Sequence, residues 1–475
     1  MICMERETMQ SPHQTRRNFL TGASAAGTLL LASRFSAAVA KVPGGPILLE
    51  ARPGSAQLLE TVKNRTSIWG FDGAVPGPVI RVKQGGEVWV RLKNSLPQPT
   101  TIHWHGIRID NAMDGVAGLT QEPVPPGESF DYRFTAPDAG TFWYHPHNRS
   151  WEQVARGLYG TLIVEEPDAP DVDQDIIAII DDWRLGEDGA IDEESFGSMR
   201  DKSHLGRLGN ILSINGKFTG EFGVRSGERI RLRLINTCNA RILKLRFEEL
   251  NPYVIAVDGQ PVTPYELDHG LVTIAPAQRV DLMVDMSGAP GDIQAITEVS
   301  RSRLVTATFN YNQLPALRAR TSKFKLPDNG LPHPEISSAR NVDLIMTGGA
   351  MGQADKVTYK GTSYDMRQLV REHGMVWAFN GNAGMPKEPL FSAHIGESIA
   401  VCMVNDTRWP HAMHFHGHHF REAGPSAPWH DTLLMDAGEK RTIYLYADNP
   451  GKWMIHCHML EHQAGGMASW FEVKA

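Results

Sequence analysis

The sequence predicts an all-β protein built from three tandem β-sandwich domains, and three observations support this prediction. The chain has 475 residues, too many for one hydrophobic core and enough for about three domains of ordinary size. Its 45 glycines and 30 prolines favour many short strands joined by turns over long helices. A strand-like segment also recurs three times along the chain.

The recurring segment begins with a glycine and a glutamate, continues as an alternation of β-branched and polar residues, and ends in asparagine. Its copies span residues 86–94, 227–236 and 396–405. Such alternation is typical of a strand with one buried face. Chance similarity between strands is the alternative, but the glycine, the acid and the asparagine match in every copy, which favours a tandem repeat.

Turns and linkers divide the chain around these copies. Asn215-Gly216 and Asn380-Gly381 precede the second and third copies as hairpin-type turns. Strand-like segments at residues 128–134 and 440–446 follow the first and third copies. Prolines near residues 167–170, and a proline- and charge-rich stretch within residues 311–340, read as linkers. We therefore expect domains at residues 41–168, 169–325 and 326–475.

The N-terminus resembles a twin-arginine export signal. Arg16-Arg17 precede a short apolar run at residues 23–32, and residues 38–40 form an A-x-A cleavage site. A membrane anchor is the alternative, but the run is shorter than the roughly 20 residues of a membrane span. The sequence predicts a signal peptide at residues 1–40, the twin-arginine machinery as a partner, and a soluble product in a bacterial periplasm or outside the cell.

Charge and cysteine content exclude two classes of protein. The net charge of -7 argues against nucleic acid as a partner. Of four cysteines, Cys3 leaves with the signal peptide, and the remaining odd number excludes a disulfide scaffold. Cys238 and Cys402 are buried thiols or a disulfide, and Cys457 lies among histidines.

Four His-x-His pairs occur in or beside strand-like segments. Residues two apart point to the same side of a strand, so each pair offers two imidazoles to one site. All four pairs belong to the first and third repeats, which predicts a multinuclear metal cluster between those two domains, with the middle domain beside them. The pairs are His103 and His105, His145 and His147, His414 and His416, and His456 and His458.

Cys457 lies between the two histidines of the last pair, so its side chain points to the opposite face. It can form a separate mononuclear site with His411, His462 and Met467. Two imidazoles, one thiolate and a weak thioether describe a blue-copper electron-transfer site. Because Cys457 is bonded to both neighbouring histidines, a short covalent path joins the two sites.

Zinc is the alternative metal, and other histidines lie outside the motifs. A structural zinc site closes with four ligands, which does not account for eight paired imidazoles and a His-Cys-Met set. His418, His419 and His430 lie near the motifs but outside the ligand count. The remaining histidines are expected at the surface or in satisfied core positions: His13, His204, His269, His333, His373 and His394.

With these motifs, and above all HCHMLEHQAGGM at residues 456–467, the mature chain resembles the multicopper oxidases, the family of laccases, ascorbate oxidase, bilirubin oxidase and bacterial cuprous oxidases. The resemblance implies cupredoxin-like Greek-key domains, four copper ions, and electrons passed from a small reducing substrate to dioxygen, giving water. It implies these ligands: type 2, His103 and His414; type 3, His105, His145, His147, His416, His456 and His458; type 1, His411, Cys457, His462 and Met467.

The resemblance also bears on proton transfer. Asp114, in a Met-Asp-Gly sequence, matches an acidic residue near the cluster, although it could simply cap a turn. Pro146 and Ala412 differ from residues common in the family without removing a ligand. Gln463 stands where many bacterial members carry a glutamate. A glutamine cannot donate as a carboxylic acid does, so the relay is expected to depend on Asp114 or water.

The reducing substrate is open to two interpretations. Asp431 matches a loop that places an acidic group near type 1 copper in several relatives, where it could accept a phenolic proton, coordinate a metal ion or cap a turn. No methionine-rich insertion of the cuprous-oxidase kind occurs, which favours a laccase-like enzyme over a periplasmic cuprous or metal-ion oxidase in copper tolerance. The methionines of this region are spread out and expected to fill packing gaps: Met346, Met351, Met366, Met375 and Met385.

Three rival functions fit less well. A non-enzymatic envelope scaffold of the same fold has no need of ten histidines, a cysteine and a methionine in ligand positions. Copper nitrite reductases generally have two cupredoxin domains and lack the paired histidines of a trinuclear cluster. A copper carrier needs only the mononuclear set.

Overall fold

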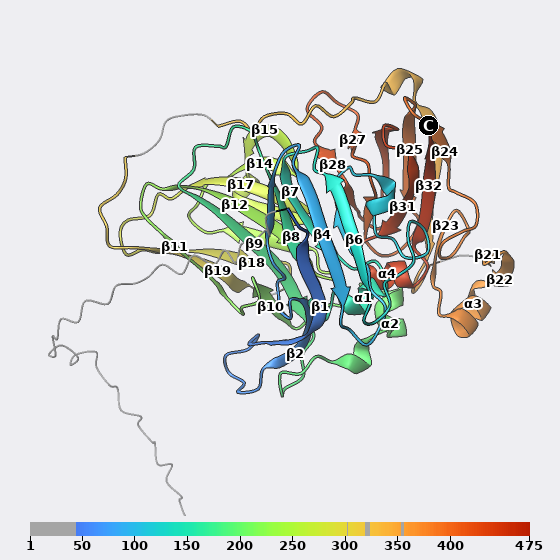
Figure 1. Cartoon of the computed structure of the whole chain (residues 1–475), viewed down its shortest axis with the longest axis horizontal. Helices are drawn as coiled ribbons and strands as arrows, with labels where there is room; N and C mark the ends of the chain where they lie inside the picture. The colour runs from blue at the N-terminus through green and yellow to red at the C-terminus, as the bar shows by residue number, and fades with distance from the viewer. Residues whose placement is uncertain (1–43, 302, 319–323, 353–355) are drawn as a thin grey trace, which may run out of the picture. The chain divides into compact units, whose positions relative to one another are not determined.

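The computed structural model describes residues 44–301, 303–318, 324–352 and 356–475, so the expected signal peptide lies outside the described residues. Within these ranges strands dominate, which confirms the all-β prediction (Figure 1). The described helices are short: α1 (Ser150–Gln153), α2 (Met199–Ser203), α3 (Met366–His373) and α4 (Leu460–Ala464). None of them has the length and apolar character of a membrane-spanning helix.

The first sandwich pairs two four-stranded sheets. One has the order β2 (Thr66–Phe71), β1 (Ile47–Ala56), β4 (Glu87–Asn94) and β6 (Ser129–Thr135), and the other the order β3 (Ile80–Lys83), β8 (Gly160–Glu165), β7 (Gly140–His145) and β5 (His103–His105).

The second sandwich has a six-stranded and a five-stranded sheet. The first has the order β10 (Ile211–Ile214), β9 (Gln174–Trp183), β12 (Arg229–Asn236), β17 (Arg279–Asp285), β14 (Tyr253–Val257) and β15 (Gln260–Glu266). The second has the order β11 (Gly220–Val224), β19 (Leu304–Tyr311), β18 (Ile293–Glu298), β13 (Leu243–Phe247) and β16 (Leu271–Ile274).

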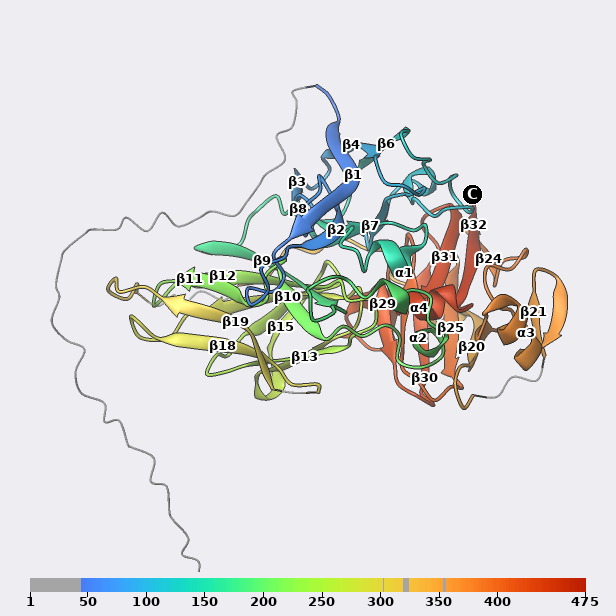
Figure 2. The same cartoon turned by 90° about the horizontal axis from the view of Figure 1, so that it is seen from below.

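The third sandwich repeats this plan and adds a hairpin, β21 (Lys356–Tyr359) and β22 (Thr362–Asp365), against which α3 packs (Figure 2). One sheet has the order β23 (Trp377–Phe379), β20 (Arg340–Gly348), β25 (Ser398–Asn405), β30 (Lys440–Tyr446), β27 (Phe420–Glu422) and β28 (Trp429–His430). The other has the order β24 (Ser392–His394), β32 (Ala468–Lys474), β31 (Gly451–Cys457), β26 (His411–Phe415) and β29 (Thr432–Met435).

The three repeat segments form the same strand in each sandwich, namely β4, β12 and β25. Each runs parallel to an earlier strand (β1, β9 or β20) and antiparallel to a later one (β6, β17 or β30). The terminal asparagines also share one role. The side-chain amides of Asn94, Asn236 and Asn405 each donate to backbone carbonyls from two or more separate parts of the chain, and their oxygens accept from the backbone N–H two residues later. The repeat therefore encodes a strand that ends in an asparagine whose side chain hydrogen-bonds neighbouring segments of the chain.

The Asn-Gly turns have the backbone conformation that the sequence predicts. Asn215 and Gly216 have φ values of 52° and 73°, and Asn380 and Gly381 have 46° and 73°. Asp72-Gly73 makes an equivalent turn in the first sandwich, with φ values of 56° and 68°, although the sequence pattern did not single it out. Positive φ in succession is tolerated by asparagine, aspartate and glycine better than by other residues.

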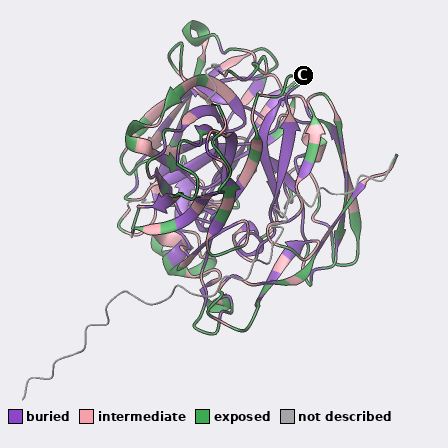
Figure 3. Ribbon diagram, turned by 90° about the vertical axis from the view of Figure 1, so that its left-hand side faces the viewer, coloured by how far each residue is buried: buried purple, intermediate pink, exposed green. Residues whose placement is uncertain are grey.

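Each sandwich has its own hydrophobic core, and the strands carry long stretches of buried residues (Figure 3). Leu92, Leu232 and Val401 of the three repeat strands are fully buried in the respective cores. Cys238 is buried and Cys402 is half-buried, and both are free thiols, so the disulfide alternative is wrong.

Candidate metal centre

Two pairs of neighbouring strands carry most of the paired histidines. β5 pairs with β7, which sets His103 opposite His145, and β26 pairs with β31, which sets His414 opposite His456. β5 and β7 belong to the first sandwich, and β26 and β31 belong to the third. The strand alternation therefore points imidazoles from both sandwiches at one another, as the spacing of the motifs predicts.

The structure gathers the eight paired histidines into overlapping groups of three whose ligand atoms lie within 4.8 Å of one another. Every one of the eight imidazoles is buried. Each group combines residues of the first and third sandwiches, so neither sandwich alone completes a group. The groups are His103, His105 and His414; His105, His145 and His458; and His147, His416 and His456.

The nitrogen atoms of these rings fit a bound metal. Nε2 of His103, His414 and His416 and Nδ1 of His105 are buried without a hydrogen-bond partner. Burial lowers the pKa of His145, as it does for the neighbouring rings, well below its usual range, so these imidazoles are neutral with a free lone pair. Unpartnered buried nitrogens are costly, and metal coordination satisfies them.

Asp114 lies where the sequence predicts it, beside the histidine groups. It is 1% exposed, and its carboxylate lies 3.1 Å from Nδ1 of His416 and 3.2 Å from Nδ1 of His103. Nδ1 of His103 also donates to the Asp114 backbone carbonyl at 2.8 Å. Asp114 thus holds His103 and His416 by their Nδ1 atoms. This orients both rings so that their Nε2 atoms face the interior of the histidine groups.

Asp431 does not lie where the sequence analysis expected it. It is fully buried, and its carboxylate accepts a hydrogen bond from Nε2 of His105 at 3.1 Å, while its carbonyl accepts from Nδ1 of His414 at 2.8 Å. Burial alone would raise the pKa of Asp431, but Arg279 and His105 hold it well below its usual range. The expectation of an acidic group beside the type 1 set is therefore wrong, because Asp431 comes just before β29 and its carbonyl accepts from the Phe415 N–H, at the opposite end of β26 from His411.

The predicted type 1 residues form a second, separate group. Nδ1 of His411 lies 3.0 Å from Nδ1 of His462, and the two nitrogens lie 3.6 Å and 3.7 Å from Sγ of Cys457. Met467 is fully buried in the same hydrophobic core, and its carbonyl accepts from the Cys457 N–H at 3.1 Å. The outer ring nitrogens are held elsewhere, Nε2 of His411 by the Thr407 hydroxyl at 3.0 Å.

Copper uptake by this second group should depend on pH. Burial raises the pKa of the Cys457 thiol to about 12 and lowers the pKa of His462 to about 4, and it lowers the pKa of His411 well below its usual range. Near neutral pH the copper-free protein therefore holds one proton, on sulfur, that copper must displace.

The affinity of this group for cuprous copper should rise about tenfold per pH unit between about pH 5 and 8. Anaerobic competition with a cuprous chelator of known pH dependence measures this slope. An affinity that does not change with pH would contradict a protonated thiol.

A segment of the middle sandwich covers His462. Nε2 of His462 donates to the His204 carbonyl at 2.7 Å, and Nε1 of Trp377 donates to the Lys202 carbonyl at 2.6 Å. The half-buried rings of His204 and Trp409 lie 5.0 Å apart, centroid to centroid, with their planes tilted by 54°. His204, assigned no role from the sequence, thus separates His462 from solvent through its backbone.

Sequence reasoning also missed Glu461, a buried carboxylic acid next to His462. Its oxygens accept hydrogen bonds from Asn239 at 2.8 Å and from the Arg207 N–H at 3.1 Å. Burial raises the pKa of Glu461. Gln463, by contrast, is half-buried, and its side-chain oxygen accepts from the Ser150 hydroxyl at 3.2 Å.

The methionines expected to fill packing gaps differ among themselves. Met346 is fully buried, as expected, but Met351 is 76% exposed and Met385 is 40% exposed. The gap-filling interpretation is wrong for these two residues, because each lies in a loop between strands rather than on an inner face.

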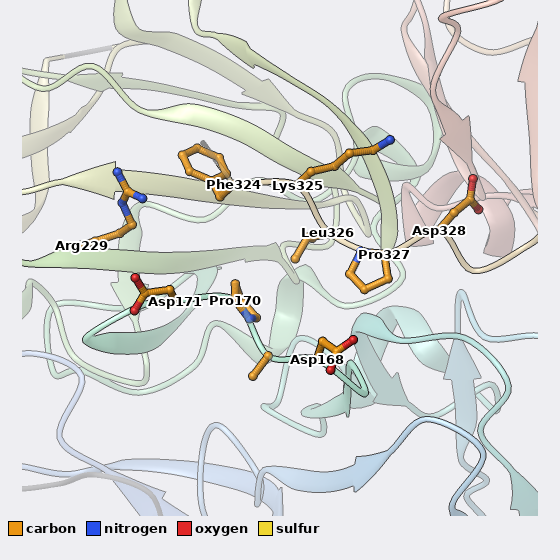
Figure 4. Close-up of a pocket in the computed structure, with 10 residues that line it drawn as sticks. Asp168, Pro170, Asp171, Arg229, Phe324, Lys325, Leu326, Pro327 and Asp328 are labelled. Atoms are coloured by element: carbon orange, nitrogen blue, oxygen red, sulfur yellow. The ribbon is translucent and has the colours of Figure 1, made fainter. Parts of the chain in front are cut away.

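A surface pocket of about 590 Å³ lies away from these groups (Figure 4). Residues 168–171 and 324–328, which join the sandwiches, line it together with Arg229. None of the predicted metal ligands belongs to its lining.

Comparisons with known proteins identify the class of protein that this fold and site define. Three models of the family described as multicopper oxidase match residues 54–169, 175–316 and 359–475. The matches fall on the three sandwiches in turn.

Individual relatives agree. The chain is 30% identical over 441 residues to "Multicopper oxidase MmcO" of Mycobacterium tuberculosis, covering 84% of this chain and 82% of that protein. It is 25% identical to the "Copper resistance protein A homolog" of Pseudomonas syringae pv. tomato, covering 95% and 98%. The crystal structure of Lac15 from a marine microbial metagenome matches with a TM-score of 0.73 and 38% identity, covering 90% of this chain and 100% of that one. The chain therefore belongs to the multicopper oxidase family, and its histidine groups are consistent with copper sites.

Proposed function

We propose that this oxidoreductase is a laccase-like enzyme that oxidises phenols or similar reductants one electron at a time and reduces dioxygen to water. The observation that carries the proposal is the position of Cys457. Its thiol lies in the His411 and His462 group, while its neighbours His456 and His458 belong to two different histidine groups. One stretch of three residues thus connects an electron-accepting site to a dioxygen-reducing site.

The proposed ligands account for four copper ions. The resemblance to the family assigns His103 and His414 to type 2 copper, and their buried, partnerless Nε2 atoms lie in one group. The type 1 ligands are His411, Cys457, His462 and Met467. The type 3 ligands are His105, His145, His147, His416, His456 and His458.

Bound copper supplies one-electron oxidation at the mononuclear site and four-electron reduction of dioxygen at the cluster. The protein supplies orientation and protons. The Asp114 carboxylate, in contact with two cluster imidazoles, is the proposed proton donor. Gln463 contributes no acidic proton, and its contact with Ser150 is that of an ordinary amide.

An aromatic reductant is favoured by what lies over His462. The rings of His204 and Trp409, tilted by 54° to each other, are half-buried, so they offer accessible aromatic surface close to the hydrogen bond that His462 donates. Aromatic rings bind such surfaces by stacking. The alternative is a metal-ion oxidase, which the similarity to a copper resistance protein and the exposed residue Met351 favour.

The proposed location is the periplasm or the exterior of a bacterium, reached through the twin-arginine machinery. Arg16-Arg17 and the A-x-A sequence at residues 38–40 support this proposal. N-terminal sequencing of the exported protein tests it, with a first residue near Lys41 as the expected result.

Oxygen uptake tests the proposed function. The copper-loaded protein should consume dioxygen with a methoxyphenol in a ratio of one dioxygen per four electrons, and added catalase should return no dioxygen, because no peroxide is released. If dioxygen uptake is faster with an anaerobically prepared cuprous salt than with the methoxyphenol, the protein is better described as a metal-ion oxidase. Fully copper-loaded protein that consumes dioxygen with neither reductant would contradict both and favour the scaffold.

A further inference from the structure

Arg279 begins β17 in the middle sandwich, which contributes no predicted copper ligand, yet its guanidinium reaches Asp431 of the third sandwich. Arg279 and Asp431 are both fully buried. Nη1 donates to Oδ1 of Asp431 at 2.9 Å, and Nη2 donates to Oδ2 at 2.6 Å. This is the two-pronged geometry that only a guanidinium makes with a carboxylate.

The same guanidinium also binds the first sandwich. Nε of Arg279 donates to the Thr141 carbonyl of β7 at 3.1 Å, and Nη1 donates to the Ala277 carbonyl at 3.2 Å. β7 carries His145 at its end. Arg279 is therefore in contact with all three sandwiches at a point directly behind the histidine groups.

Asp431, which Arg279 holds in place, in turn holds two of the imidazoles by hydrogen bonds. Oδ1, the oxygen that Nη1 of Arg279 binds, also accepts from Nε2 of His105 at 3.1 Å and from the Thr432 hydroxyl at 2.8 Å. With its proton on Nε2, His105 must direct the lone pair of Nδ1 inward, and that atom is buried without a partner. The Asp431 carbonyl holds Nδ1 of His414 in the same way.

The ion pair of Arg279 and Asp431 is closely packed against the backbone of the first sandwich. A Cβ atom on Gly106, the residue after His105, would lie 2.1 Å from Nη2 of Arg279 and 2.4 Å from Oδ2 of Asp431. Gly106 has φ of 83°, so glycine is needed there for conformation as well as for space. The backbone beside His105 thus lies against the ion pair itself.

We propose that Arg279 is a positioning residue through which the middle sandwich fixes Asp431 and, through it, the orientation of His105 and His414 in the trinuclear site. This inference rests on the proposed copper assignment. It gives the middle sandwich a role in the chemistry, although that sandwich supplies none of the proposed ligands.

The experiment compares Arg279→Lys and Arg279→Gln with a matched control, Arg231→Lys. Arg231 lies on β12, the neighbouring strand, is 1% exposed, and pairs with Asp281 and Glu166 rather than with Asp431. Lysine keeps the charge but cannot make two parallel hydrogen bonds while also reaching Thr141. If disturbing any buried ion pair of this sheet were enough to change the copper sites, the control variant would show the same change.

Two measurements separate positioning from stability. In the copper-loaded proteins, the type 2 electron paramagnetic resonance signal and the visible absorption of the type 1 site report the two sites separately. We expect Arg279→Lys to keep the visible absorption, to change the type 2 signal, and to lower copper affinity at the cluster about tenfold. In the copper-free proteins, nitrogen-15 histidine spectra report the ring tautomers, and Arg279→Lys and Arg279→Gln should both lose the Nε2-protonated form of His105.

The control should lower the unfolding temperature and leave all three spectra unchanged. The proposal is overturned if folded Arg279→Lys keeps the wild-type type 2 signal and His105 tautomer, or if Arg231→Lys reproduces its changes. If one Arg279 variant fails to fold, the same measurements on the other variant test the proposal. If both variants fail to fold, Arg279 is needed for folding, and the proposal that it only positions Asp431 is overturned. Wild-type protein without a type 2 signal would instead contradict the proposed copper assignment.

Discussion

Replacing Cys457 by serine is expected to abolish the intense visible absorption of the protein and its reductant-driven dioxygen uptake, while the histidine groups still bind copper. The absorption comes from thiolate bonded to copper, and a hydroxyl cannot replace it. The uptake stops because the thiol links the His411 and His462 group to the backbone that carries His456 and His458. This is the largest effect that we predict for a single substitution.

Visible spectra, copper analysis and an oxygen electrode measure the result together. Cys402→Ser is the matched control, because Cys402 is a free, half-buried thiol in β25 of the same sandwich and is not among the proposed copper ligands. The control should keep both the colour and the activity. Uptake at the wild-type rate in Cys457→Ser would contradict the proposed path of electrons.

Replacing Asp114 by asparagine is expected to slow dioxygen uptake about 10–100-fold, the usual cost of removing a group that orients metal ligands. The carboxylate contacts His103 and His416 within 3.2 Å, and asparagine keeps the shape but loses the charge and the acidic proton. The type 1 absorption should remain, and anaerobic reduction of the type 1 site by a phenol should keep its wild-type rate.

Stopped-flow measurement of the two half-reactions locates the defect. Asp110→Asn is the control, since Asp110 is exposed and its side chain accepts from the Ala112 N–H in the turn before Asp114. The control should behave as wild type. A slower anaerobic reduction in Asp114→Asn, with normal reoxidation by dioxygen, would contradict a role at the cluster.

The sequence was sufficient to predict the strands and which histidines lie together. Strand alternation depends on residues two apart, so His103 and His105, or His456 and His458, are placed on one face by local geometry alone. The repeat likewise predicts β4, β12 and β25, because the glycine, the alternation and the terminal asparagine are all local signals.

The groups behind the histidines could not be predicted in the same way. Asp431 and Arg279 are 152 residues apart and meet only because three sandwiches pack at one point. An arginine and an aspartate in or beside strands normally indicate solvent-facing positions, and nothing local distinguishes this buried pair from Arg91 and Asp131 at the surface. The segment that covers His462 binds it through the backbone carbonyl of His204. Every residue has such a carbonyl, so the identity of residue 204 could not predict this contact.

Copper content per chain, measured on protein loaded with excess copper and freed of unbound metal, tests the central claim most directly. Four ions per chain in the wild type and three in Cys457→Ser are the expected values, since the two sets of ligands are separate in the structure. A wild-type protein that retains one ion or none would contradict a trinuclear site formed by the eight paired histidines.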